Sequence, residues 1–143
     1  MKFIKAVRAH YLEVLFLTAL NTGMRKGELL TLTWNNIDFK NKTTTANKSV
    51  KHIAKFDETL NRFYEYVLQT PKTEKSNRVI PITDVLVDYL KRRGLKYKEN
   101  KMLVAVLYDD NKIVFCNQFG RYLDGSFVLK KYKNILKRAN FFL

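Results

Sequence analysis

Histidine, cysteine and glycine are scarce in this chain, and their scarcity limits the chemistry that it can perform. Its 143 residues include two histidines, one cysteine and five glycines. Neither histidine has a second histidine or cysteine at metal-ligand spacing, so no metal site is expected. A glycine-rich phosphate loop, a dinucleotide-binding signature and a serine-nucleophile motif are all missing. We therefore expect no metal and no nucleotide cofactor.

Long apolar runs and paired cysteines are also missing. The longest apolar stretch, residues 14–20, is interrupted by Thr18 and is far shorter than the roughly 20 residues of a transmembrane helix. The lone Cys116 cannot form an internal disulfide, which is usual in a reducing compartment. Basic residues before the apolar run imitate a signal peptide, but Glu13 interrupts it and no cleavage site follows. The expected location is the cytoplasm, without a membrane segment.

Acidic residues are a minority among the charges. Lys and Arg number 27 against 13 Asp and Glu, which gives a net charge of +14; small soluble domains usually carry roughly 2 to 8. With 46% hydrophobic and 13% aromatic residues, the chain is too apolar for a disordered basic tail. One folded domain over residues 1–143 is expected. Nucleic acid is the partner that the charge favours, over mere solubility or a membrane surface.

Apolar periodicity predicts several helices. Residues 11–20 are expected to form a buried helix that ends at an Asn-Thr-Gly breaker, and residues 25–32 a second short helix. Thr83 is a plausible N-cap for a third helix, which is expected to close at Gly94. Residues 128–139 place apolar side chains at helical spacing opposite lysines and an arginine. This last segment is therefore an amphipathic basic helix, with Tyr132 expected in the core.

Alternation and turn signals predict a few strands. The threonine-rich residues 43–50 favour a strand, whereas residues 51–61 lack a clear period and are expected to be a loop or edge segment. Residues 63–68 and 79–82 are expected to pair as a hairpin with its tip at 72–77. A linker at 96–101, an apolar helix or strand at 102–107 and a short strand at 113–115 complete the expected elements. The fold class is α+β, mostly helical with a small three-stranded antiparallel sheet.

Two motifs carry a family resemblance. Residues 22–38 read T-G-M-R-K-G-E-L-L-T-L-T-W-N-N-I-D, which resembles the first arginine box of the tyrosine recombinases, the phage integrase family: T-G-x-R-x-x-E-L, then L-x-W-x-x-I-D. Residues 71–82 read P-K-T-E-K-S-N-R-V-I-P-I, which resembles the lysine hairpin of that family, P-K-T-x-x-S-x-R-x-I-P. Two boxes in the same order and spacing are not a plausible coincidence. The resemblance implies the fold of the tyrosine-recombinase catalytic domain.

Other parts of the family pattern have no counterpart in these 143 residues. The H-x-x-R box, the following His or Trp box, the nucleophilic tyrosine and the separate N-terminal DNA-binding domain are not found. The resemblance therefore implies a DNA-binding fragment of an enzyme that cuts and rejoins duplex DNA through a 3′-phosphotyrosyl link, inactive by itself. Complete family members assemble as tetramers on DNA, whereas this fragment is expected to be a monomer or to self-associate weakly.

The resemblance assigns three catalytic positions. Arg25 matches the first arginine, and a guanidinium can hold both non-bridging oxygens of an attacked phosphodiester while staying charged. The helix start after Gly23 is expected to add backbone N–H groups near the phosphate. Glu28 would orient the site, although an ordinary surface salt bridge between Arg25 and Glu28 is the alternative. Lys72 matches the lysine that donates a proton to the leaving 5′ oxygen, with Lys75 as its alternative if the alignment slips.

Further basic residues are expected to contact DNA: Lys26, Lys75, Arg78, Lys130 and Lys131. Two alternatives remain. The chain is a noncatalytic basic module for RNA or another anion, with Arg25 and Lys72 incidental, or it supplies half of a site to a partner chain. Since absent helices would normally cover part of the domain, the surface near Leu29, Leu30 and the last helix is expected to be unusually apolar, or the chain to self-associate.

Overall fold

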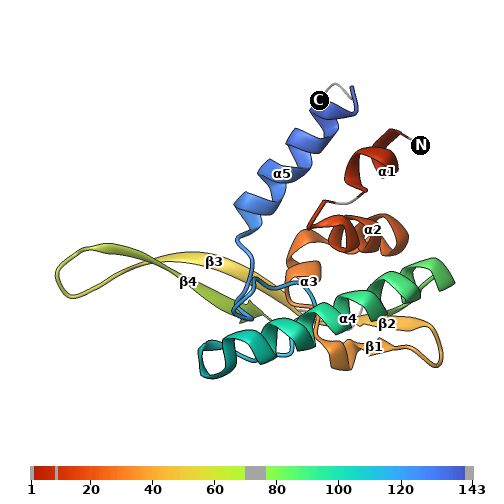
Figure 1. The fold of residues 1–143 in the computed structure, drawn as a ribbon. Helices are drawn as coiled ribbons and strands as arrows, with labels where there is room; N and C mark the ends of the chain where they lie inside the picture. The colour runs from red at the N-terminus through yellow and green to blue at the C-terminus, as the bar shows by residue number, and fades with distance from the viewer. Residues whose placement is uncertain (1, 9, 70–76, 141–143) are drawn as a thin grey trace.

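The computed structural model describes residues 2–8, 10–69 and 77–140 (Figure 1). About half of the structure is helical, and the strands form small antiparallel sheets, which confirms the expected fold class. The helices are α1 (Lys2–Val7), α2 (Glu13–Thr22), α3 (Lys26–Leu30), α4 (Asp84–Val104) and α5 (Gly125–Arg138), with 3-10 turns at η1 (Trp34–Asn36) and η3 (Ala105–Leu107). The strands are β1 (Ile37–Asp38), β2 (Thr43–Ala46), β3 (Ser49–Phe56), β4 (Arg62–Gln69) and β5 (Arg78–Pro81).

The strand pairing differs from the predicted hairpin. In the three-stranded sheet β2 lies between β1 and β5, and β3 and β4 form a separate two-stranded ribbon, with antiparallel neighbours throughout. The ribbon extends away from the helices in Figure 1. The expectation that residues 63–68 pair with 79–82 is therefore wrong. Of the loop or edge segment expected over 51–61, the first six residues belong to β3, an edge strand of the two-stranded ribbon, and not to a loop. Pro81 does end β5, as expected, opposite Thr43.

A tight turn at residues 57–61 explains why the predicted strand pairing is wrong. The Asp57 carboxylate accepts hydrogen bonds from the Thr59 amide and the Asn61 amide, each at 2.9 Å. Leu60 completes the turn with φ of +63°. Asp and Asn side chains that bond to nearby backbone close tight turns without a glycine. Because this turn contains neither Gly nor Pro, the sequence analysis did not predict it. Residues 51–56 were therefore not expected to pair with the strand that follows the turn.

Helix α4 continues through Gly94 and over the predicted linker. Its N-cap is confirmed, since the Thr83 hydroxyl accepts from the Leu86 amide at 3.2 Å. Beyond it, Leu90 and Tyr97 are buried and extend the apolar face past Gly94. A Cβ at Gly94 would stand 3.5 Å from the ring of Trp34. Gly94 is thus a contact point inside the helix rather than its end, because packing outweighs the weak helix propensity of glycine.

The remaining segments show smaller differences from the predictions. Residues 113–115 are buried but form only an isolated bridge, between Thr33 and Ile113, and no strand. Residues 102–107 form the last turn of α4 and η3. The helix α1 was not predicted; its Phe3 and Val7 are buried against the core. Among the described residues, no helix is both long and apolar enough to cross a membrane.

The hydrophobic core lies between the helices and the sheet. Leu86, Leu90, Ile113 and Ile135 are among its most completely buried side chains. Tyr132, expected in the core, is 37% exposed and packs edge-on against the Phe3 ring and at a tilt against the Phe16 ring. It lines an apolar groove of about 260 Å³ between α1, α2, α3 and α5.

The apolar surface expected near Leu29 and Leu30 is covered in part. Both side chains are buried, at 4% and 2% exposed, although both line that groove. On the last helix, α5, Phe127 is 40% and Leu129 41% exposed. Other exposed apolar side chains gather at the end of α4 and η3, where Met102 is 82% and Val106 97% exposed.

Candidate functional site

A tight turn between α2 and α3 presents Arg25. Gly23 ends α2 with φ of +66°, in the left-handed region that favours glycine. The Thr22 hydroxyl donates to the Thr18 carbonyl at 2.7 Å and accepts from the Met24 amide at 3.3 Å. Arg25 follows as the N-cap residue of α3, with an exposed side chain. The turn therefore fixes the backbone of Arg25 while its guanidinium faces solvent.

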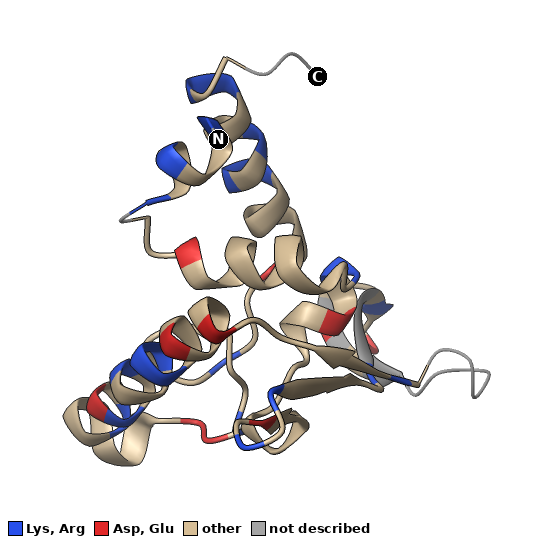
Figure 2. Ribbon diagram, turned by 90° about the vertical axis from the view of Figure 1, so that its right-hand side faces the viewer, with Lys and Arg blue, Asp and Glu red and all other residues tan. Residues whose placement is uncertain are grey.

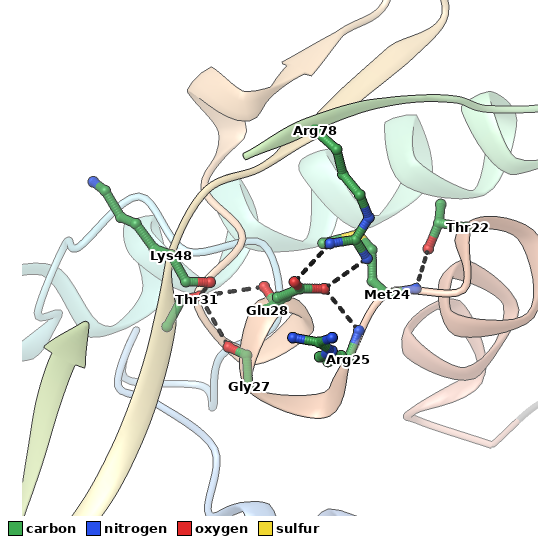
Figure 3. A network of polar contacts seen from close by, with 8 residues as sticks. All are labelled: Thr22, Met24, Arg25, Gly27, Glu28, Thr31, Lys48 and Arg78. Atoms are coloured by element: carbon green, nitrogen blue, oxygen red, sulfur yellow. Dashed lines mark hydrogen bonds and ion pairs between the residues drawn. The ribbon is translucent and has the colours of Figure 1, made fainter. Parts of the chain in front are cut away.

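Glu28 lies at the centre of a polar network beneath this turn (Figure 3). Its side chain is only 8% exposed, yet its carboxylate receives three hydrogen bonds. The Arg78 guanidinium donates to Oε1 at 2.8 Å and to Oε2 at 3.0 Å, and the Arg25 backbone N–H donates to Oε2 at 2.8 Å. Burial by itself raises the pKa of the Glu28 carboxyl, but these bonds from Arg78 and Arg25 prevail and lower it. Glu28 is therefore a buried carboxylate at neutral pH.

The positive charge of the Arg25 guanidinium helps to lower the pKa of the Glu28 carboxyl without a direct contact between the two. In the parts of the chain that the structure describes, this guanidinium forms no ion pair, with Glu28 or with another acid. The alternative of an Arg25–Glu28 surface salt bridge is thus not what the structure contains. Backbone N–H groups at this helix start were expected near the phosphate; that of Arg25 is bonded to Glu28. The guanidinium itself remains available to an anion from solvent.

The C-terminal end of α3 is hydrogen-bonded to the residue that precedes β3. The buried Thr31 hydroxyl lies 3.0 Å from the Lys48 carbonyl oxygen and 2.9 Å from that of Gly27. Since Lys48 directly precedes β3, this contact links α3 to the ribbon (Figure 3). The short helix that begins at Arg25 is therefore held at both of its ends.

Two of the expected DNA contacts flank the turn. Lys26 is exposed, and its Nζ lies 3.4 Å from where a Cβ on Gly125 would stand, so α5 begins beside α3. Arg78, the first residue of β5, is 35% exposed and directs two of its nitrogens at Glu28. Lys26 is thus free to reach a ligand, whereas much of Arg78 is engaged inside the protein.

Two further expected DNA contacts, Lys130 and Lys131, lie on α5. Lys130 is exposed, and the Lys131 ammonium stands 5.2 Å from the centre of the Phe127 ring. Figure 2 shows Lys and Arg gathered over α5 and the neighbouring α1, whereas α4 carries both signs of charge. This basic end is formed by Lys2, Lys5, Arg8, Lys130, Lys131, Lys133, Lys137 and Arg138. The predicted amphipathic basic helix is confirmed.

Lys72 and Lys75 lie outside the described residues, so their placement relative to Arg25 stays a prediction. No group of three or more His, Cys, Asp or Glu side chains that could hold a metal occurs among the residues that are described. His10 accepts a hydrogen bond from the Leu12 amide at 3.1 Å and stacks on Tyr11.

The partners of Glu28 and Thr83 were missed by sequence reasoning. Arg78 lies 50 residues from Glu28, and the Thr83 hydroxyl donates to the Asn21 side-chain oxygen at 2.9 Å across 62 residues. No local pattern indicates such pairs. A charged residue at a helix N3 position, as Glu28 is, suggests only its backbone partner.

Comparison with known proteins identifies the family and the fold of the chain. The fold matches that of tyrosine-recombinase catalytic-domain structures. The sequence model of the phage integrase family matches residues 1–142, and the chain belongs to that family.

Two relatives illustrate the relationship. A XerC-like tyrosine recombinase of Caldanaerobacter subterraneus subsp. tengcongensis is 40% identical over 141 residues, which are 96% of this chain and 36% of the relative. An integrase of Staphylococcus phage L54a is 30% identical over 119 residues, 83% of this chain and 32% of the relative. The chain thus spans about a third of the length of these curated relatives.

Solved structures share the fold. The integrase of transposon Tn1549 bound to transposon right end DNA aligns with a TM-score of 0.68 and 19% identity, over 96% of this chain and 42% of that one. The XerA recombinase aligns with a TM-score of 0.64 and 17% identity, over 97% and 40%. XerH bound to a palindromic difH substrate, in a post-cleavage complex, gives 0.61 and 18%, over 99% and 34%.

Proposed function

We propose that this chain is part of the catalytic domain of a site-specific tyrosine recombinase, and that it binds duplex DNA with Arg25 on a scissile phosphate. The observation that carries the proposal is the exposed Arg25 guanidinium, which has no internal ion pair among the described residues, above the buried Glu28. Its setting in a phage integrase family chain with a net charge of +14 supports the same conclusion. The solved structures of the Tn1549 integrase and of XerH are complexes with DNA.

The chemistry follows from the charges. Attack on a phosphodiester builds negative charge on the non-bridging oxygens, and a guanidinium binds two oxygens with parallel hydrogen bonds. Arg25 fits this role because it keeps its charge at any relevant pH. Lys72, or Lys75 in its place, would protonate the leaving 5′ oxygen. Lys26, Lys130 and Lys131 would hold the backbone of the duplex without reading its sequence.

The chain by itself should bind DNA and leave it intact. The 143 residues contain no match to the second arginine box or to the nucleophilic tyrosine of the family. Cleavage and rejoining through a 3′-phosphotyrosyl link, and assembly as a tetramer, are proposed for the complete enzyme. The chain alone is proposed to act in the cytoplasm as one domain over residues 1–143, monomeric or weakly self-associating.

A fluorescent duplex tests this function. Purified chain should shift the anisotropy of a labelled duplex of about 25 base pairs, and Arg25→Ala should weaken binding about tenfold, as expected for one charge-assisted contact of 1–2 kcal/mol. Denaturing gels should show neither cut strands nor a covalent protein–DNA adduct. Either product would contradict the proposal that the chain alone cannot cleave DNA. Absence of binding would contradict the proposed DNA-binding function.

The same assay separates the noncatalytic alternative. If Arg25→Ala leaves the affinity unchanged while Lys130→Gln with Lys131→Gln abolishes binding, the chain is a basic module and Arg25 is incidental. The site proposed above predicts that both changes weaken binding. Mixing the chain with a polypeptide that carries the missing boxes, and scoring strand exchange, tests whether it supplies half of a site.

A further inference from the structure

One carboxylate joins three parts of the chain that are distant in sequence. Glu28 Oε2 accepts from both the Arg25 amide and the Arg78 guanidinium, and Oε1 accepts from Arg78 as well. Arg78 begins β5, and Arg25 begins α3. Figure 3 shows the two arginines on either side of Glu28, the Arg78 guanidinium directed at it. The start of β5 is therefore connected to the Arg25 turn through a single side chain.

A second contact fastens the other end of the same segment. Just beyond β5, the Thr83 hydroxyl donates to the Asn21 side-chain oxygen at 2.9 Å. Asn21 belongs to the last turn of α2, immediately before the turn that presents Arg25. Residues 78–83 are thus bonded at both ends to residues 21–28. The two segments cannot shift relative to each other without breaking one of these contacts.

Burial decides which role Arg78 plays. Glu28 is 8% exposed, and a buried carboxylate that loses its cation is strongly destabilised because water cannot replace the partner. If Arg78 turned toward a DNA phosphate, it would leave this charge behind. The paired geometry also uses both terminal nitrogens of the guanidinium, which a lysine ammonium cannot reproduce.

We propose that Arg78 is a positioning residue: acting through Glu28, it holds the beginning of β5 in fixed register with the turn that carries Arg25. The sequence analysis assigned Arg78 to DNA contact; the geometry points to an internal role instead. The inference rests on the proposed function for its consequence in DNA binding, but not for the internal role itself.

A double-mutant cycle on the 143-residue chain tests the role. Affinity for a labelled duplex is measured by anisotropy at several salt concentrations for Arg78→Gln, Arg78→Lys and Arg25→Ala, and for each Arg78 change combined with Arg25→Ala. Arg121→Gln is the matched control, since Arg121 is an exposed arginine outside the network. Circular dichroism at each condition ensures that only folded variants are compared.

Positioning and phosphate contact predict different results. A positioning Arg78 makes Arg78→Lys as harmful as Arg78→Gln, by about three- to tenfold, and makes either change nearly silent once Arg25 is alanine. If Arg78 contacts a phosphate, Arg78→Lys should retain most of the affinity, and the losses of affinity from the Arg78 and Arg25 changes should multiply. Arg78→Gln should then also reduce the magnitude of the slope of log K against log salt by about 0.9. The second pattern would overturn the proposal.

A measurement without DNA keeps the two proposals distinguishable. Carboxyl NMR titration of Glu28 and hydrogen exchange of the Arg25 amide are compared between the wild type and Arg78→Gln or Arg78→Lys. If Arg78 positions the turn, the Glu28 titration moves to higher pH and the Arg25 amide exchanges faster in both variants. Unchanged values overturn the positioning role even if DNA binds; changed values support it even if the chain binds no DNA and the proposed function fails.

Discussion

At the scale of single residues, Glu28 makes the stability of the chain depend on pH. The pKa of its carboxyl is lowered in the folded state, although burial opposes this, because Arg78 and the Arg25 amide donate to it. A lowered folded pKa means that the unfolded chain binds more protons in the acidic range. The stabilisation is complete above the unfolded pKa of about 4.3 and is lost as the pH falls through the folded value.

Replacing Glu28 by glutamine should therefore flatten the acid side of the stability profile. At pH 7 we expect Glu28→Gln to lower the free energy of unfolding by about 1–3 kcal/mol, because Arg78 loses a charged partner. At low pH the variant and the wild type should converge. Urea denaturation between pH 3 and 7 measures both, with Glu99→Gln, in an exposed pair with Lys96, as the control. A constant difference at all pH values would contradict the expectation.

The site residues illustrate what sequence reasoning could and could not supply. Arg25 and Glu28 were singled out through the family motif, and the structure adds that the Arg25 side chain is exposed, whereas Glu28 is buried and accepts a hydrogen bond from the Arg25 amide. Arg78 was found too, but as a DNA contact. The sequence alone does not show whether a charged side chain is buried or solvated, because burial depends on which distant parts of the chain pack against it.

At the scale of elements, helix α4 shows how packing overrides local propensity. A glycine followed by a polar stretch predicted that the helix closes at Gly94, yet α4 runs on to Val104. The buried Leu90 and Tyr97 on either side continue one apolar face, and the Trp34 ring lies against Gly94. The helix gains more from this burial than the glycine costs.

Gly94→Ala should consequently stabilise the chain. Alanine has the higher helix propensity, and its Cβ would meet the Trp34 ring at 3.5 Å and 3.7 Å, ordinary van der Waals distances. We expect a gain of about 0.5–1 kcal/mol in the free energy of unfolding. Thermal and urea denaturation measure it. Gly120→Ala is a contrasting variant that should destabilise, because Gly120 has φ of +78° and its Cβ would clash with the Asp109 carbonyl oxygen at 2.3 Å. A loss on Gly94→Ala would mean that the helix is strained at this point.

The sequence predicted several of the segments that form strands, but it did not predict which strands pair. Residues 43–46, 62–69 and 78–81 are strands, as their composition suggested, but β4 pairs with β3 and β5 with β2. Composition reports whether a segment suits a pleated, half-buried position. It does not report which other strand lies beside it, since that depends on turns such as the one that Asp57 closes.

At the scale of the whole molecule, the excess of positive charge should make DNA binding strongly dependent on salt. The described cations proposed to face DNA are Arg25, Lys26, Lys130 and Lys131, and each phosphate they neutralise releases counterions. Four such contacts give a slope of log K against log salt near −3.6, or about a hundredfold loss of affinity for a fourfold rise in salt. Anisotropy titrations from low to moderate salt measure the slope. A slope near zero would exclude phosphate contacts as the source of affinity.

The sequence by itself determined the fold class and the family, and it singled out Arg25 and Glu28 as candidate site residues, since these inferences depend on residue types at fixed local spacing. It also determined the basic face of α5, which is a matter of helical periodicity. Only the tertiary structure decided that Glu28 is buried, that Arg78 faces it, that α4 passes through Gly94, and which strands pair. These features join residues tens of positions apart, and such contacts are fixed by the packing of the complete fold rather than by any short stretch of chain.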